Sequence, residues 1–149
     1  MIDASLRTFL GREESYALHA LIYAAENPGA SAARIAQDLA MPAAFMAKVL
    51  GKLAQAGLIE NRMGRHGGVH PVPGTRQATL LQVIEAISGP FVMDTCQAQA
   101  ECITTRRKGY CRLNVAYHQA GAEIRTILMG VRVDDLADAP QGEVPRPAS

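Results

Sequence analysis

The sequence predicts a mainly α-helical protein with a small β-hairpin wing: a winged helix-turn-helix domain followed by a long C-terminal dimerisation helix. Three observations lead to this prediction. Two short helical segments and a tight break precede a third amphipathic helix, and a basic, glycine-containing hairpin follows it. An apolar stripe then recurs at intervals of three and four residues near the C-terminus, as in helices that pair with one another.

The composition suits one ordinary core, or one core plus a dimer arm. The chain has 149 residues, an apolar fraction of 48% and a net charge of +1. We expect a winged helix-turn-helix domain over residues 1–76, a linker helix, cysteine loop and dimerisation helix over 77–137, and a flexible tail over 138–149. No apolar run is long enough for a membrane span, and no signal-like core opens the chain. An odd number of cysteines then favours the reducing cytoplasm.

The first two helices are indicated by their capping signals. An apolar, alanine-rich helix over residues 16–25 is stopped at 27–29, which reads Asn-Pro-Gly. Ser31 is placed to cap a short helix over 32–40, whose apolar residues Ile35 and Leu39 share one face.

The third helix and the hairpin complete the predicted winged helix-turn-helix. Pro42 is expected to open a helix over residues 43–57, and Gly57 to close it. Its apolar face consists of Phe45, Val49, Leu50 and Leu53. Residues 58–72 read as two short strands around a glycine-rich turn, because glycine permits the positive φ angles of a tight hairpin.

Two further helices lie on either side of the cysteines. Residues 79–89 predict an amphipathic helix whose apolar side holds Leu80, Val83, Ile84 and Ile87. After the cysteine loop comes the stripe, which suits the same helix of a second subunit and consists of Leu113, Tyr117, Ala120, Ile124, Ile127 and Val131.

Positive charge is concentrated in the predicted DNA-binding segment. Between Leu39 and Leu80, five basic residues face one acid, Glu60, which leaves +4. DNA phosphates require such charges, and a basic hairpin tip suits a narrow minor groove. We therefore predict binding to a double-stranded DNA operator, with contacts from Ser31, Lys48, Lys52, Arg62, Arg65 and His66. Solvated lysines on a helix face and a plain surface loop are the alternative interpretation.

Four stretches together resemble the winged-helix regulators that include IscR and NsrR, the Rrf-two family: the helix at 16–25, the segment 35–68 from the second helix to the hairpin, the helix at 80–89 and the three-cysteine loop. The resemblance covers roughly residues 8–137. It implies a homodimeric bacterial transcription factor, often a repressor. Many members hold an iron–sulfur cluster and sense nitric oxide, redox state, iron or cluster supply. The resemblance also implies that the cluster ligands are Cys96, Cys102 and Cys111.

The residues themselves are compatible with this cofactor. Five residues separate Cys96 from Cys102 and eight separate Cys102 from Cys111, wider than the close pairs of structural zinc sites. The basic stretch 106–108 would favour thiolates. Zinc and idle thiols remain alternatives, as do a metal-free regulator that senses oxidants through its thiols and a small thiol redox enzyme.

The fourth cluster ligand departs from the pattern. One branch of the family has a histidine shortly after the third cysteine, where this chain has Asn114, and His118 follows one helical turn later. Another branch uses an acidic residue near the N-terminus of the partner subunit; Ser15 holds that position here, and our candidates are Glu14 beside it or an exogenous ligand. The cluster type, 2Fe–2S or 4Fe–4S, is left open.

Overall fold

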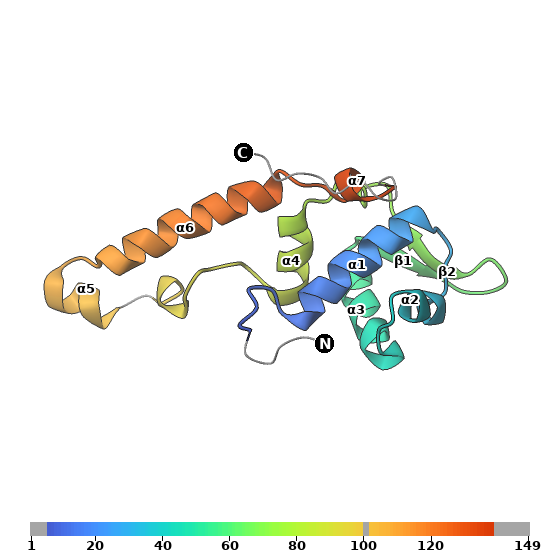
Figure 1. Cartoon of the computed structure of the whole chain (residues 1–149), viewed down its shortest axis with the longest axis horizontal. Coiled ribbons are helices and arrows are strands. Elements are labelled where there is room, and N and C mark those ends of the chain that lie inside the picture. The colour runs from blue at the N-terminus through green and yellow to red at the C-terminus, as the bar shows by residue number, and fades with distance from the viewer. Residues whose placement is uncertain (1–5, 100–101, 139–149) are drawn as a thin grey trace.

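The computed structural model describes residues 6–99 and 102–138. It is mainly helical with a two-stranded antiparallel hairpin, as predicted. Figure 1 shows a compact group of helices beside the hairpin, with α6 extending away from it and α5 at its far end. In chain order the elements are α1 Arg12–Glu26, α2 Ala32–Asp38, α3 Ala43–Gln55, β1 Ile59–Arg62, β2 Gly68–Pro71, α4 Leu80–Ser88, the 3-10 turn η1 Thr95–Gln97, α5 Ile103–Lys108, α6 Arg112–Met129 and α7 Val133–Leu136.

The core lies between α1, α3 and α4. Three alanines of α1, Ala17, Ala20 and Ala24, are completely buried, and such small side chains allow neighbouring helices to approach closely. The largest buried side chains that meet them come from α1, α2, α3 and α4 and include Leu21, Ile35, Met46, Leu53 and Val83. Burial of these side chains is the main favourable contribution to folding.

Helix ends follow the predicted signals. The Ser31 hydroxyl accepts the Arg34 backbone N–H at 3.1 Å, which caps α2. Pro42 directly precedes α3, and Gly57 follows its end with a φ of +72°. The prediction for α4 needs one correction: Leu81 is buried there, whereas Leu80 is only half-buried.

The wing is attached to the turn before α2. Strands β1 and β2 pair in the register Ile59 to Pro71. Val69 also exchanges backbone hydrogen bonds of 2.8 Å with the turn, accepting from Gly29 and donating to Ala30. This bridge holds the hairpin against the end of α1, so the wing has a defined position relative to α2 and α3 (Figure 1).

The C-terminal part leaves the core and then returns to it. Gly121 is the only residue of α6 that is buried within the described chain, and the predicted stripe residues Leu113 and Ile127 are 58% and 67% exposed. Val131 of the stripe lies beyond the end of the helix. The chain then packs back as α7, where Val133 is buried and its N–H donates to the Ala78 carbonyl at 2.9 Å.

The cysteine loop and the C-terminal tail are the remaining predicted segments. The predicted cysteine loop contains η1 and α5, because Asp94 caps the first and Gly109, at a φ of +76°, ends the second. Apart from Asp138, the predicted tail at 138–149 lies outside the described residues. None of the described helices is both long enough and apolar enough to cross a membrane.

Candidate DNA interface and cysteine pocket

The exposed face of α3 is made of small and polar side chains: Ala43, Ala44, Ala47, Lys48 and Gln55. Beside them, a β-carbon added to Gly51 would meet no atom within 4 Å. Short side chains allow the backbone of a helix to come close to a surface, and alanine can contact the methyl group of thymine. The backbone of α3 is therefore open to close approach on this face.

The two lysines of α3 are held by a carboxylate from α1. Glu13 accepts from the Lys52 ammonium at 2.6 Å and also forms an ion pair with Lys48. These bonds, the one from Lys48 foremost, hold the pKa of Glu13 below its usual value. The Lys48 side chain is 58% exposed and the Lys52 side chain 31%. Sequence reasoning missed this role of Glu13, since 39 residues separate it from Lys52.

The wing presents its cations at the tip. Arg62 donates from Nε to Glu60 at 2.8 Å on the same strand. Arg65 and His66 are exposed, and neither forms a hydrogen bond or an ion pair with the described part of the chain. Of the predicted DNA contacts on the wing, these two side chains are directly available to a phosphate.

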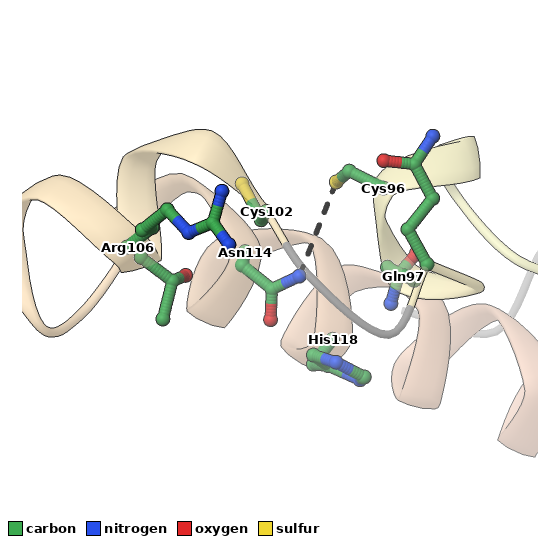
Figure 2. A pocket seen from close by; sticks show the side chains of 8 residues that line it. Cys96, Gln97, Cys102, Arg106, Asn114 and His118 are labelled. Atoms are coloured by element: carbon green, nitrogen blue, oxygen red, sulfur yellow. Dashed lines mark hydrogen bonds between the residues drawn. The ribbon is translucent and has the colours of Figure 1, made fainter.

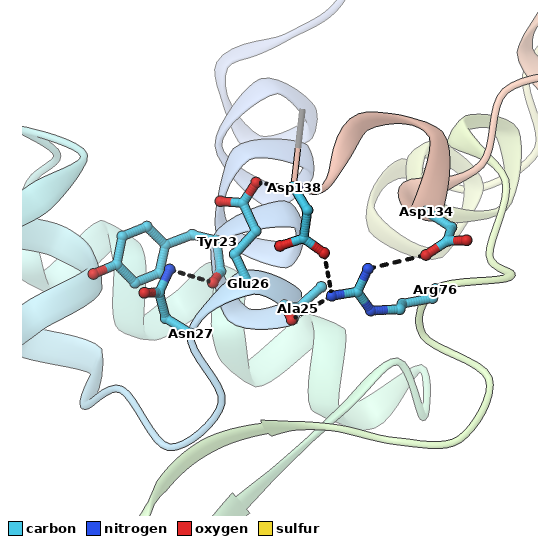
Figure 3. Close-up of polar contacts among 7 residues, drawn as sticks. All are labelled: Tyr23, Ala25, Glu26, Asn27, Arg76, Asp134 and Asp138. Carbon is cyan, nitrogen blue, oxygen red and sulfur yellow. Dashed lines mark hydrogen bonds and ion pairs between the residues drawn. The ribbon is translucent and has the colours of Figure 1, made fainter. Parts of the chain in front are cut away.

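Arg76 was counted in the predicted positive segment, but it is engaged elsewhere. Its guanidinium donates to Asp134 at 2.9 Å, to Asp138 at 2.8 Å and to the Ala25 carbonyl at 3.1 Å (Figure 3). It therefore joins the end of α1 to α7. Its charge is neutralised by acids that lie outside the segment from which the +4 was counted.

Cys96 and Cys102 line a polar cavity of about 430 Å³ between η1, α5 and α6. Figure 2 shows the labelled side chains around it: Cys96, Gln97, Cys102, Arg106, Asn114 and His118. Cys111 caps α6 and accepts the backbone N–H of Asn114, and Asn114 itself lines the cavity. The structure thus brings thiols from three separate turns into one region.

Asn114 connects two of the cysteines. Its backbone N–H donates to the Cys111 sulfur at 3.4 Å, and its side-chain amide donates to the Cys96 sulfur at 3.9 Å (Figure 2). N–H groups that point at sulfur stabilise its anionic form. At the position where one branch of the family has a histidine ligand, this chain therefore has a donor to sulfur.

The thiols differ in acidity. The backbone N–H groups of Thr105 and Thr104 donate to Cys102 and lower its pKa. Burial raises the pKa of Cys96, and the neighbouring Asp94 carboxylate raises it further. Cys102 is therefore the more readily ionised of the two.

The side chains around the cysteine cavity differ in how well they suit a single metal ion and an iron–sulfur cluster. Within residues 6–99 and 102–138, no three His, Cys, Asp or Glu side chains come close enough together to hold one metal ion. A cluster distributes its thiolate ligands over several iron atoms, and two thiols that line one cavity, with a third joined to it through Asn114, suit that donor set in kind. The candidate fourth ligand, Glu14, accepts a hydrogen bond from Ser88 at the end of α4.

Comparisons with known proteins point to one family of transcriptional regulators. A family model described as Rrf2, iron-dependent transcriptional regulator, matches residues 10–139. Protein aau3 of Rhizobium meliloti is 32% identical over 133 residues, which cover 87% of this chain and 85% of that protein. The HTH-type transcriptional repressor NsrR of Streptomyces coelicolor is 27% identical over 110 residues, which cover 74% of this chain and 72% of that protein.

Solved structures share the fold. IscR of T. potens has a TM-score of 0.71 and 17% identity, and the match covers 95% of this chain and 94% of that one. CymR, the global cysteine regulator of B. subtilis, has a TM-score of 0.64 and 20% identity, and the match covers 88% and 97% of the two chains. The family model over residues 10–139 and the 32% identity to protein aau3 show that the chain belongs to the Rrf2 family of DNA-binding transcriptional regulators, which are not enzymes, and the solved structures agree in fold.

Proposed function

We propose that the protein is a cytoplasmic, homodimeric repressor whose affinity for its operator depends on an iron–sulfur cluster bound by Cys96, Cys102 and Cys111. The observation that carries this proposal is that Cys96 and Cys102 line one cavity with Asn114, which donates to both Cys96 and Cys111. The cluster would supply a reactive centre for nitric oxide, oxidants or changes in iron and cluster supply.

The chain's own residues support cluster binding in three ways. Cys102 has a lowered pKa and Arg106 lines the cavity, and both features favour thiolate and an anionic group. Asn114 offers N–H donors to sulfur. Glu14 remains our candidate for the fourth ligand, and either a 2Fe–2S or a 4Fe–4S cluster accepts three thiolates and a weaker fourth ligand.

Dimer formation is supported by α6. This helix exposes the apolar side chains Leu113 and Ile127 of the predicted stripe, which are 58% and 67% exposed in the single chain. Pairing two copies along this face would bury them. Two recognition helices related by a two-fold axis would then read a near-palindrome with half-sites about 34 Å, or a multiple of it, apart.

The proposed DNA contacts come from α2, α3 and the wing. Ser31 at the start of α2, Lys48 on α3, and Arg62, Arg65 and His66 on the wing are exposed. Replacing Arg65 with alanine should weaken binding to every sequence and reduce the steepness of the salt dependence by about 0.9 for each lost phosphate contact.

The test of the proposed function compares three forms of the protein on one promoter fragment at constant salt. Protein purified without oxygen should contain iron and acid-labile sulfide, and Cys102→Ala should lose both. We expect the holo form to bind roughly 5- to 150-fold more tightly than the apo form and the Cys102→Ala variant, a range typical of allosteric coupling. Equal affinities of all three forms would contradict cluster control.

A metal-free thiol sensor is the second candidate. The lowered pKa of Cys102 favours it, because thiolates are the species that oxidants attack. In that case the purified protein would contain no stoichiometric iron or sulfide, and DNA affinity would differ between the thiol-reduced and peroxide-treated forms. Metal analysis followed by this comparison distinguishes the two candidates.

A further inference from the structure

Lys52 lies at a junction of three helices. From α3 its ammonium donates to Glu13 of α1 at 2.6 Å and to the Ile87 carbonyl, near the end of α4, at 3.3 Å. The next residue of α4, Ser88, donates its hydroxyl to Glu14, the neighbour of Glu13. These contacts form a closed ring that connects the first turn of α1, the recognition helix α3 and the C-terminal end of α4.

The ring lies between the exposed face of α3 that is proposed to bind DNA and the cysteine pocket. Helix α3 carries the exposed face proposed to enter DNA, whereas α4 leads through residues 89–95 into Cys96. A displacement of the end of α4 therefore acts directly on Lys52. The Ile87 carbonyl belongs to the last turn of α4, where a cation also interacts favourably with the helix dipole, so this contact favours one position of α3 relative to α4.

We infer that Lys52 is a positioning residue that couples the cysteine pocket to the recognition helix, and that it is not a phosphate contact. This inference rests on the proposed function. Its partly buried side chain already has an anion and a carbonyl as partners. Lys48 shares Glu13 but is far more exposed, so it is free to exchange that carboxylate for a phosphate. The two lysines of one helix face thus have different roles.

The test compares Lys52→Met with Lys48→Met, which remove the same charge from the same helix and the same carboxylate. Methionine keeps an apolar stem of similar length. Each variant, in holo and apo form, is titrated with one promoter fragment at several salt concentrations. We expect Lys52→Met to reduce the ratio of holo to apo affinity about 2- to 30-fold, while the salt dependence stays that of the wild type. Lys48→Met should keep the ratio and flatten the salt dependence by about 0.9 for each lost phosphate contact.

The outcomes of these titrations distinguish a positioning role of Lys52 from a phosphate contact. If Lys52→Met flattens the salt dependence and keeps the ratio, Lys52 contacts phosphate and the inference is wrong. If the wild type itself has a ratio of one, the proposed cluster control fails, and the salt arm still decides whether Lys52 touches DNA. Glu13→Gln keeps both lysines but removes their shared anion, so it should reduce the ratio as well; it provides the same test if Lys52→Met does not fold. An unchanged ratio in Glu13→Gln would also overturn the inference.

Discussion

Gly68 of the wing lies against Gly29 so closely that a β-carbon on Gly68 would be 2.2 Å from the Gly29 carbonyl oxygen. Gly68 also has a φ of +124°, which residues with side chains rarely adopt. Since the obstructing atoms are backbone, they cannot move without displacing the turn that precedes α2. This contact fixes the position of the wing.

We therefore expect Gly68→Ala to destabilise the protein by more than about 1 kcal/mol and to weaken DNA binding. Gly74→Ala is the matched control, because its β-carbon would meet nothing within 4 Å. Urea denaturation and DNA titration of both variants measure the two effects. Wild-type behaviour of Gly68→Ala would show that the hairpin does not need this close approach.

Ser31 has a predicted role in DNA binding and an observed role as the cap of α2. Ser31→Ala should cost about 1 kcal/mol of stability, because the Arg34 N–H loses its acceptor. Ser31→Asp restores an acceptor but places a negative charge where a phosphate would lie. If Ser31 contacts DNA, the Ser31→Asp variant should be stable but bind DNA weakly. Urea denaturation measures the stability, and titration with a promoter fragment measures the affinity. Tight DNA binding by this variant would leave Ser31 only its role as the cap of α2.

Arg76 should behave as a structural residue although it lies in the positive segment. Because its guanidinium is held by Asp134, Asp138 and the Ala25 carbonyl, Arg76→Met should lower the melting temperature. The steepness of the salt dependence of DNA binding should not change. A flatter salt dependence in this variant would place Arg76 on the DNA after all.

The ion pairs of Glu13 predict an acid-sensitive contribution to stability. The folded protein holds the pKa of Glu13 below its usual value, since Lys48 and Lys52 donate to the carboxylate. The contribution is fully present above about pH 4.3, the ordinary pKa of a glutamate, and is lost as pH falls through the lower folded value. The melting temperatures of wild type and Glu13→Gln should therefore differ at neutral pH and converge in acid.

The two cavity thiols should react in a fixed order in the apo protein. Cys102 has a lowered pKa because backbone N–H groups donate to it, while burial raises the pKa of Cys96. Only the thiolate is alkylated, so iodoacetamide should modify Cys102 at a lower pH than Cys96. Mass spectrometry of peptides after brief labelling at several pH values measures this order. The reverse order would mean that the N–H groups do not point at Cys102 in solution.

Local signals in the sequence were sufficient for the elements of the DNA-binding domain. Ser31 caps α2, Gly57 ends α3 and the glycines at 64–68 turn the wing, because each property depends on a few neighbouring residues. The predicted loop around the cysteines was less accurate: η1 and α5 are too short for periodicity to reveal them.

By itself, the sequence determined the fold class, the order of its helices and hairpin, and the family resemblance. Only the tertiary structure decided which basic side chains are available to DNA phosphates. Glu13 reaches Lys52 across 39 residues, and Asp134 reaches Arg76 across 58, so a charge count within one segment could not include these partners. In the same way, Asn114 meets Cys96 only because η1 and α6 pack together. Ion pairing and hydrogen bonding act over a few ångströms in space, and separation along the chain says nothing about them until the helices have packed.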